Sequence, residues 1–338
     1  MEKSKICRRC VLVENGVDVR LNQEGVCNIC LDYSEGGKTD NLQRNPLESG
    51  FIKILNKTKG KGEYDCLVMC SGGKDSTAAL YFMKKRYKLN ALAFTFDHSF
   101  ESKEALENVK NAAEALKADF LYFKSEFMKE MFCDILKNNS KAVLCHVCSI
   151  WYMDIVLKTA ARFKIPVIIG GWTKGQCSRK AESARERFDE KEKEFASMSK
   201  ETKEFLNMYK KTNPKYRDFP LSMREAITRA GKKHKCVILS PHWFLPFSSE
   251  DYTEIIKKEL GWKPVALSYP AKSTNCELNF ISVYNSIKYF GYTHYHVEMA
   301  KMVREGVLDR EEALKNLEIN FDKTLLNKIA AKLDYRFD

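Results

Sequence analysis

The stretch DCLVMCSGGKDST, from Asp65 to Thr77, decides the fold. It predicts a buried strand over Cys66 to Cys70, a tight turn at Gly72 and Gly73, and a helix directly after the turn. Such a turn leaves backbone N–H groups directed at one point, which is also the positive end of the helix dipole. Together with the ammonium group of Lys74, this arrangement predicts a binding site for a phosphate or pyrophosphate.

The order of residues excludes the common nucleotide-binding loop, because Lys74 is followed by Asp75 and not by Ser or Thr. The hexapeptide SGGKDS from Ser71 to Ser76 instead resembles the PP-loop of the ATP pyrophosphatase, or adenine nucleotide alpha hydrolase, superfamily. The resemblance implies that ATP is cleaved between its alpha and beta phosphates and that AMP activates a carbonyl or carboxyl oxygen. The residues that we expect to bind ATP here are Ser71, Gly72, Gly73, Lys74, Asp75, Ser76 and Thr77. Lys74 and Asp75 are also expected to be catalytic, and Asp75 and Ser76 are expected to help hold Mg²⁺ or to cap the helix.

Apolar runs alternate with helical patterns beyond this stretch. Strands are predicted over 65–70, 91–96, 119–123, 165–169 and 236–239, and helices over 74–87, 101–116, 127–136, 151–163 and 252–260, the last capped by residues 249–251. This pattern predicts an α/β fold with a parallel, Rossmann-like sheet, in which ligands lie at the carboxyl ends of the strands. Residues at those ends are candidates for the nucleotide site: Phe96 and Asp97 for adenosine, and Gly170 and Gly171 for phosphate or substrate. An ordinary turn after the strand explains Asp97 equally well.

Two CxxC pairs stand near the N-terminus, Cys7 with Cys10 and Cys27 with Cys30. Their spacing is typical of a four-cysteine zinc site, which would provide the folding energy of a segment this small. Four cysteine ligands leave no open position, so we expect a structural zinc ribbon. Four cysteines without a metal are the alternative.

A third CxxC pair, Cys145 and Cys148, lies at a predicted helix start, and Cys276 lies in a loop before another. Three cysteines cannot complete a tetrahedral zinc site, but they suit a 4Fe-4S cluster with one iron left open, which could hold sulfide. A redox or persulfide-carrying pair and three inert thiols are the alternatives.

The chain of 338 residues has a formal charge of +12. Between Lys174 and Lys235 there are eighteen Lys and Arg against ten Asp and Glu, so most of the excess lies in one stretch. Tyr209, Tyr216 and Phe219 are interleaved with its lysines, which suits either base stacking or the core face of a helical insertion. The predicted divisions are a zinc ribbon over 1–45, a PP-loop domain over 60–175, a basic helical insertion over 176–235, and a completing, mainly helical part over 236–338.

No apolar stretch approaches the length of a membrane span and the N-terminus lacks the pattern of a signal peptide, so we expect a cytoplasmic protein without a membrane partner. Cysteines in that compartment are read first as metal or redox ligands. The sequence leaves the oligomeric state open, a homodimer included.

Three features narrow the resemblance: the N-terminal knuckles, the central CxxC, and the tail REGVLDREEA from Arg304 to Ala313. This order is similar to the N-acetyl sugar amidotransferases of surface-glycan pathways, which implies ammonia from a separate glutaminase. Cys145, Cys148 and Cys276 resemble those of sulfur-inserting PP-loop enzymes, including tRNA thiolases and thioamide synthetases. The thiolases that act on tRNA usually carry a Gly-His-Asn type sequence after the fourth strand, whereas Gly170-Gly171-Trp172 stands here, so tRNA is disfavoured.

The sequence therefore predicts an enzyme that binds ATP and Mg²⁺ and adenylates a carbonyl or amide oxygen of a small or carrier-bound substrate. Sulfur, held by the three cysteines, then displaces AMP. Amidation of an N-acetyl sugar is the second hypothesis. A zinc-ribbon protein that binds RNA is the third.

Overall fold

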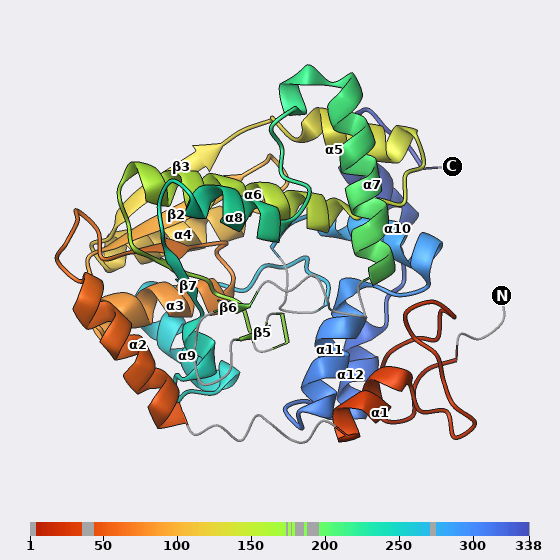
Figure 1. Cartoon of the computed structure of the whole chain (residues 1–338), viewed down its shortest axis with the longest axis horizontal. Coiled ribbons are helices and arrows are strands. Elements are labelled where there is room, and N and C mark those ends of the chain that lie inside the picture. Colours follow the sequence, from red (N-terminus) through yellow and green to blue (C-terminus); the bar gives the residue numbers. More distant parts are fainter. Residues whose placement is uncertain are drawn as a thin grey trace.

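A five-stranded parallel sheet forms the centre of the computed structural model (Figure 1). The structure describes residues 5–35, 44–173, 175–176, 178–179, 186–187, 196–270 and 275–337. The strand order is β3-β2-β1-β4-β7. The strands are β1 (Cys66–Met69), β2 (Ala91–Asp97), β3 (Asp119–Lys124), β4 (Val167–Ile169) and β7 (Val237–Leu239). The predicted parallel α/β fold is confirmed.

The order of the strands explains where a ligand would bind. Leu67 of β1 pairs with Leu92 of β2 on one side and with Ile168 of β4 on the other. From β1 the chain builds β2 and β3 on one side of that strand. It then crosses back to form β4 on the other side of β1, and this reversal of strand order leaves a crevice at the carboxyl ends of β1 and β4. The PP-loop begins directly after β1, so it lies at this crevice.

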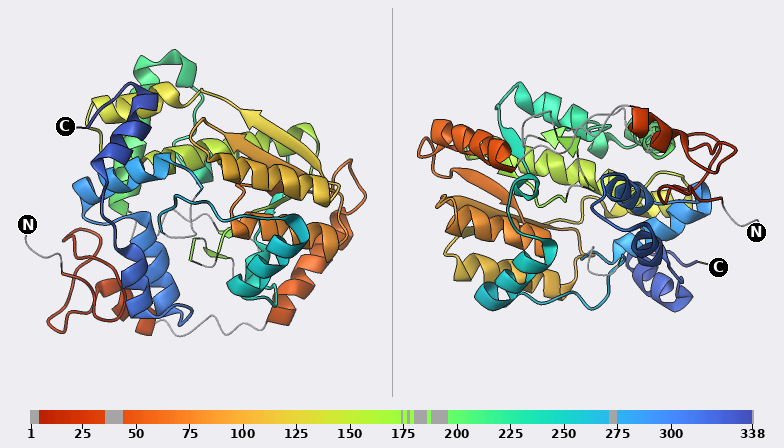
Figure 2. Two further views of the ribbon diagram at one scale, coloured as in Figure 1. Left: turned by 180° about the vertical axis from the view of Figure 1, so that it is seen from behind. Right: turned by 90° about the horizontal axis from the view of Figure 1, so that it is seen from below.

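Helices cover both faces of the sheet (Figures 1 and 2). They are α1 (Asn28–Glu35), α2 (Arg44–Thr58), α3 (Lys74–Lys85), α4 (Lys103–Ala115), α5 (Lys129–Lys137), α6 (Leu144–Arg162), α7 (Ala196–Thr212), α8 (Met223–Gly231), α9 (Ser249–Leu260), α10 (Leu278–Phe290), α11 (His294–Arg304), α12 (Arg310–Leu317) and α13 (Lys323–Ala330). Alternate side chains of β1 enter two separate cores, because successive residues of a strand point to opposite faces. Val68 joins the core with α2, α3 and α9, while Leu67 joins the core with α5, α6 and the C-terminal helices.

Two predicted helix boundaries are wrong, each for a local reason. The helix predicted from Glu101 begins at Lys103, because Ser102 is its N-cap and Glu101 instead forms an isolated β-bridge with Cys276. The cap of α9 is Ser248, whose hydroxyl accepts a hydrogen bond from the Asp251 amide. The helix start predicted at the central CxxC pair is confirmed, because α6 begins at Leu144 and continues through the predicted residues 151–162.

The N-terminal segment packs against the C-terminal helices, as Figure 2 shows from below. Isolated bridges between Ile6 and Val13 and between Leu21 and Cys27 shape the segment, and α1 closes it. The Asp18 carboxylate accepts hydrogen bonds from Tyr292 Oη, at 3.1 Å, and from the Ser197 amide, at 3.2 Å. The segment is thus anchored to α7 and to the start of α11, far from the sheet.

The described part of the basic stretch forms α7, α8 and a short antiparallel pair of strands, β5 (Ser178–Arg179) and β6 (Glu186–Arg187), while residues 174, 177, 180–185 and 188–195 lie outside the described residues. Tyr209, Tyr216 and Phe219 are buried, which confirms that they belong to the core face of the insertion. No helix in the described ranges is long and apolar enough to cross a membrane.

Candidate active site

The PP-loop ends at the open start of α3. Gly73 is the N-cap of this helix and offers no side chain for capping, and the first bond of the helix runs from the Thr77 amide to Gly73 O at 3.0 Å. The preceding amides of the first turn therefore have no intrahelical acceptor. These donors and the helix dipole point to the place where the sequence predicts a bound phosphate.

At two positions of the loop region, neighbouring backbone atoms leave room only for glycine. Gly72 has a φ of +78°, and a Cβ added there would lie 2.0 Å from Ala105 O. A Cβ at Gly171 would lie 2.5 Å from Ser76 Cα, so the backbone after β4 approaches the loop directly. Only glycine permits both approaches.

Side chains also hold the loop in shape. The Ser71 amide donates to Ser76 Oγ at 3.1 Å, and Ser76 Oγ donates to Gly73 O at 3.2 Å. From outside the loop, Trp262 Nε1 donates to Gly72 O at 2.9 Å and Asn108 Nδ2 donates to the same oxygen at 3.1 Å. Ser76 therefore braces the loop.

Lys74 and Asp75 form an ion pair in which Lys74 Nζ lies 2.9 Å from both carboxylate oxygens. The Tyr252 hydroxyl donates to the same carboxylate, and His242 Nε2 lies 3.0 Å from Asp75 O. Burial lowers the pKa of His242, which favours its neutral form. For Lys74 to contact a phosphate, it must exchange Asp75 for the ligand, and Asp75 would then be available to a magnesium ion.

The predicted adenosine contacts, Phe96 and Asp97, lie at the end of β2. Phe96 is buried and packs edge-on against Trp151, with ring centroids 4.7 Å apart. The Asp97 carboxylate accepts hydrogen bonds from the Tyr122 hydroxyl and from the Ser99 amide, the latter at 2.7 Å. Gly170 donates to Leu239 O at 2.9 Å, so it continues the β4–β7 pairing.

The structure brings the three predicted cysteines together around one carboxyl group. Cys145 and Cys148 lie in the first turn of α6, and Cys276 lies two residues before α10. Burial raises the pKa of all three thiols, and the nearby Glu101 carboxylate adds a smaller effect. The pKa of Cys145 rises to about 11. Asn275 Nδ2, beside Cys276, donates to Ser71 O at 3.2 Å. The segment that carries Cys276 therefore lies next to the PP-loop.

Three further titratable side chains lie near the site: His98 and Glu101, for which no pattern in the sequence predicts a role, and Glu298. Thr173 Oγ1 donates to Glu298 Oε1 at 3.3 Å, and burial, with a smaller effect of Asp75, raises the pKa of Glu298 to about 7. Burial likewise raises the pKa of Glu101 to about 8. Raised carboxyl pKa values in a crevice are typical of functional sites. For Glu298 the sequence offers only its position, because the residues from Tyr292 to Glu298 could reach the cleft from the C-terminal part.

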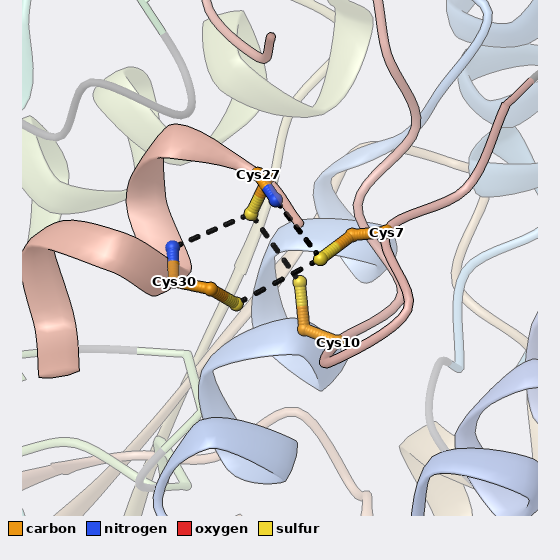
Figure 3. A group of neighbouring side chains, drawn as sticks. All are labelled: Cys7, Cys10, Cys27 and Cys30. Atoms are coloured by element: carbon orange, nitrogen blue, oxygen red, sulfur yellow. Dashed lines mark hydrogen bonds between the residues drawn. The ribbon is translucent and has the colours of Figure 1, made fainter. Parts of the chain in front are cut away.

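The four N-terminal cysteines converge at a separate site, drawn in Figure 3. The Cys7 and Cys30 sulfurs are 3.9 Å apart, and those of Cys10 and Cys27 are 3.8 Å apart. Zinc–sulfur bonds of about 2.3 Å in a tetrahedron place the sulfurs about 3.8 Å apart. The thiols therefore fit one zinc ion, and these distances are too long for disulfides.

Comparison with known proteins supports the PP-loop part of the chain. Residues 65–148 match the model of the queuosine biosynthesis protein QueC family, a PP-loop family. The uncharacterised protein MJ1599 of Methanocaldococcus jannaschii is 24% identical over 311 residues, which cover 86% of this chain and 92% of that protein.

Three solved structures resemble the chain at low TM-scores. The U34-tRNA thiolase NcsA of Methanococcus maripaludis, solved with its [4Fe-4S] cluster, is 14% identical, with 91% of this chain and 89% of that chain covered and a TM-score of 0.36. The NMN synthetase of Francisella tularensis is 11% identical, with 87% and 98% covered and a TM-score of 0.39. The NH3-dependent NAD synthetase of Campylobacter jejuni is 16% identical, with 56% and 94% covered and a TM-score of 0.33.

We draw no functional conclusion from structural likenesses at these TM-scores. The family match carries more weight, because it spans β1, the PP-loop and the CxxC pair at the start of α6. The loop SGGKDS, its place between β1 and α3, and this match together identify residues 65–148 as a PP-loop segment of the adenine nucleotide alpha hydrolase superfamily.

Proposed function

We propose that this protein is an ATP-dependent enzyme that adenylates a carbonyl or amide oxygen of its substrate and replaces that oxygen with sulfur. The observation that supports this proposal best is the hydrogen bond from Asn275 to Ser71 O, at 3.2 Å. It joins the segment that carries Cys276 to the loop that would hold the phosphates. A nucleophile held by the thiols would thus start close to an activated carbon.

In the adenylation step, the loop amides and the start of α3 bind the phosphates of ATP. Lys74 leaves Asp75 and neutralises the charge that develops on the departing pyrophosphate, while Asp75 helps to hold Mg²⁺. The substrate oxygen attacks the alpha phosphorus, the bond between the alpha and beta phosphates breaks, and pyrophosphate leaves. The products of this step are an acyl- or imidoyl-adenylate and pyrophosphate.

The three cysteines could deliver sulfur in two ways, through a cluster or through a persulfide. A 4Fe-4S cluster on Cys145, Cys148 and Cys276 fits the donor type, and when bound it would supply an open iron for sulfide. The three sulfurs do not group within 4.8 Å of one another among the described residues, so they do not share a single ion, whereas a cluster binds each thiolate to a different iron.

Without a cluster, a persulfide on Cys145 or Cys148 would attack the adenylate and AMP would leave. The partner thiol then attacks the sulfur that remains on the protein, which releases the thio product and leaves a disulfide between the two cysteines. An external thiol reductant must reduce that disulfide before the next turnover.

Amidation of an N-acetyl sugar with ammonia from a separate glutaminase is the second candidate. One contact favours it: Arg310, in the tail that carries this resemblance, donates from Nη2 to Cys7 O at 3.0 Å and from Nε to Cys10 O at 3.0 Å. The tail and the N-terminal knuckles thus form one unit. The sulfur and nitrogen reactions share the adenylation step and differ only in the nucleophile.

The two candidates are separated by the metal and sulfide content of protein purified without oxygen, together with a nucleophile assay. Sulfur insertion predicts that sulfide or a persulfide donor supports AMP release and that ammonium does not. Zinc as the only metal, with AMP release that depends on ammonium, would reject sulfur insertion and favour the sugar amidotransferase.

A further inference from the structure

Three different metal-binding side chains meet at Cys276. His98 Nε2 lies 3.7 Å from Cys276 Sγ and 3.7 Å from Glu101 Oε1, and all three donor atoms lie within 4.8 Å of one another. His98 is buried, and the other two residues are partly buried. This group is distinct from the four-cysteine site and from the PP-loop.

The backbone fixes two of these side chains in place. Glu101 and Cys276 form an antiparallel bridge, with the Glu277 amide donating to Phe100 O at 2.8 Å and the Ser102 amide donating to Asn275 O at 2.9 Å. Main-chain hydrogen bonds on both sides of the Glu101–Cys276 bridge thus join two segments that are more than 170 positions apart in the sequence. Because directly opposed residues of an antiparallel bridge point to the same face, the carboxyl and thiol groups lie on one side of the main chain.

The distances exclude two simpler interpretations. At 3.7 Å, His98 Nε2 and Glu101 Oε1 are too far apart for a hydrogen bond. A nucleophile–histidine–acid relay needs the thiol and the carboxylate on opposite ring nitrogens. Here both face Nε2, while Nδ1 lies 3.3 Å from the Phe100 amide.

The same distances fit a single ion. Bonds of about 2.0–2.3 Å from zinc to nitrogen, oxygen and sulfur, at tetrahedral angles, separate nitrogen from sulfur by about 3.6 Å and nitrogen from oxygen by about 3.4 Å. The observed 3.7 Å separations are within a few tenths of an ångström of both. The four-cysteine site passes the same test.

We propose that His98, Glu101 and Cys276 bind one divalent transition-metal ion, Zn²⁺ or Fe²⁺, with one position open to a small exogenous ligand such as water or hydrosulfide. Three protein ligands with an open fourth position are the pattern of catalytic sites. The ion would also balance the carboxyl group, whose only basic neighbour within 4.0 Å among the described residues is His98. This inference goes beyond the proposed function and shares only Cys276 with it. Because a single ion and a three-cysteine cluster both need the Cys276 thiolate, this assignment leaves Cys145 and Cys148 as the sulfur-carrying pair.

Metal binding has a consequence for His98 that can be measured. An imidazole that binds an ion through Nε2 carries its proton on Nδ1, and that proton would meet the Phe100 amide. The distance between His98 Nδ1 and the Phe100 amide nitrogen must therefore increase when the metal ion binds. We expect the Phe100 amide resonance to shift when metal is added to the chelated full-length protein.

The test is metal analysis of the full chain purified without oxygen, with Co²⁺ substitution as a second readout. Wild-type protein should hold two ions, one at each site. His98→Ala and Glu101→Gln should each reduce this to one, while Glu104→Gln, an exposed carboxylate in the first turn of α4, and Cys148→Ser should keep both. In the Co²⁺ protein, Cys276→Ser should remove the part of the sulfur-to-cobalt absorption that remains in a Cys7→Ser, Cys27→Ser background.

Other outcomes overturn the inference. Four irons with sulfide that are lost in each of Cys145→Ser, Cys148→Ser and Cys276→Ser and kept in Glu101→Gln would replace the single ion by a cluster, and would support the sulfur reaction. One ion per chain in the wild type, unaffected by His98→Ala, would leave these residues without a metal. Neither result depends on turnover of ATP, so failure here is distinguishable from failure of the proposed reaction.

Discussion

At the scale of single residues, Gly72 is the position where the loop tolerates least change. Alanine there would have to adopt a φ of +78° and to place Cβ 2.0 Å from Ala105 O. We expect Gly72→Ala to lower the free energy of unfolding by more than about 2 kcal/mol and to abolish nucleotide binding. Urea unfolding and nucleotide titration measure both effects.

Gly50→Ala provides the matched control for this prediction. Gly50 lies inside α2, and a Cβ added there meets no atom within 4 Å. Helix propensity predicts a gain of about 0.5–1 kcal/mol in stability. Equal effects of the two substitutions would contradict the close contact at Gly72.

Lys74 is predicted to act on the chemistry and not on the fold. Its ammonium forms an ion pair with its neighbour Asp75 and lies 5.9 Å from the centre of the Tyr252 ring, so Lys74→Ala should change the free energy of unfolding by no more than about 1 kcal/mol. Loss of a charge that stabilises the leaving pyrophosphate should slow its release by about 100-fold or more. Lys85→Ala, in the exposed last turn of the same helix, should leave the rate unchanged. If Lys74→Ala released pyrophosphate at the wild-type rate, the proposed role of the PP-loop in the reaction would be rejected.

Local patterns explain which residues the sequence could predict. The roles of Ser71 to Ser76 depend on neighbours within one turn, and the CxxC pair depends on the start of one helix. His98 and Glu101 acquire their role from Cys276, which is more than 170 positions away, and no local pattern encodes that contact. Glu101 was assigned to a helix for the same reason, because its bridge to Cys276 is invisible in the sequence.

At the scale of elements, the four-cysteine segment is expected to stabilise the fold without taking part in the reaction. The segment contacts α7, Tyr292 just before α11, and α12, and none of its described contacts reaches the PP-loop. Replacement of Cys7 and Cys27 by Ser should remove one zinc ion, lower solubility and expose residues 5–35 to hydrogen exchange. AMP release per folded molecule should be unchanged.

Cys133→Ser serves as the control for that experiment. The Cys133 thiol donates to Leu333 O at 3.0 Å, a bond that a serine hydroxyl can also make, so zinc content and solubility should not change. If well-folded protein without the N-terminal zinc lost the chemical step, the structural role would be rejected.

At the scale of the whole molecule, stability should depend on pH through Glu298. Burial raises the pKa of this carboxyl group from 4.5 to about 7, so the folded state keeps a proton that the unfolded state has lost between those values. The free energy of unfolding should therefore fall as pH rises across this interval, by up to about 1.4 kcal/mol per pH unit. Glu298→Gln should flatten this dependence, whereas Glu259→Gln, an exposed residue of α9, should not. Denaturation curves at pH 5, 6 and 7 would reject the assignment if the two variants behaved alike.

The overall architecture follows from the sequence further than the site does. Alternation of apolar strands and helices predicted the parallel sheet, and the strand order β3-β2-β1-β4-β7 places the PP-loop at the reversal point. How the C-terminal helices pack was not predictable, because Glu298 reaches the crevice only after α11 folds back beside Thr173. The predicted domain boundaries stay predictions.

The central claim is that ATP is cleaved between its alpha and beta phosphates at the PP-loop. The most direct test is to identify the nucleotide products when the full chain is incubated with ATP, Mg²⁺ and a small-molecule extract. The account predicts AMP and pyrophosphate in equal amounts from the wild type and neither from Lys74→Ala. ADP and phosphate from the wild type, or unchanged AMP release from Lys74→Ala, would contradict it.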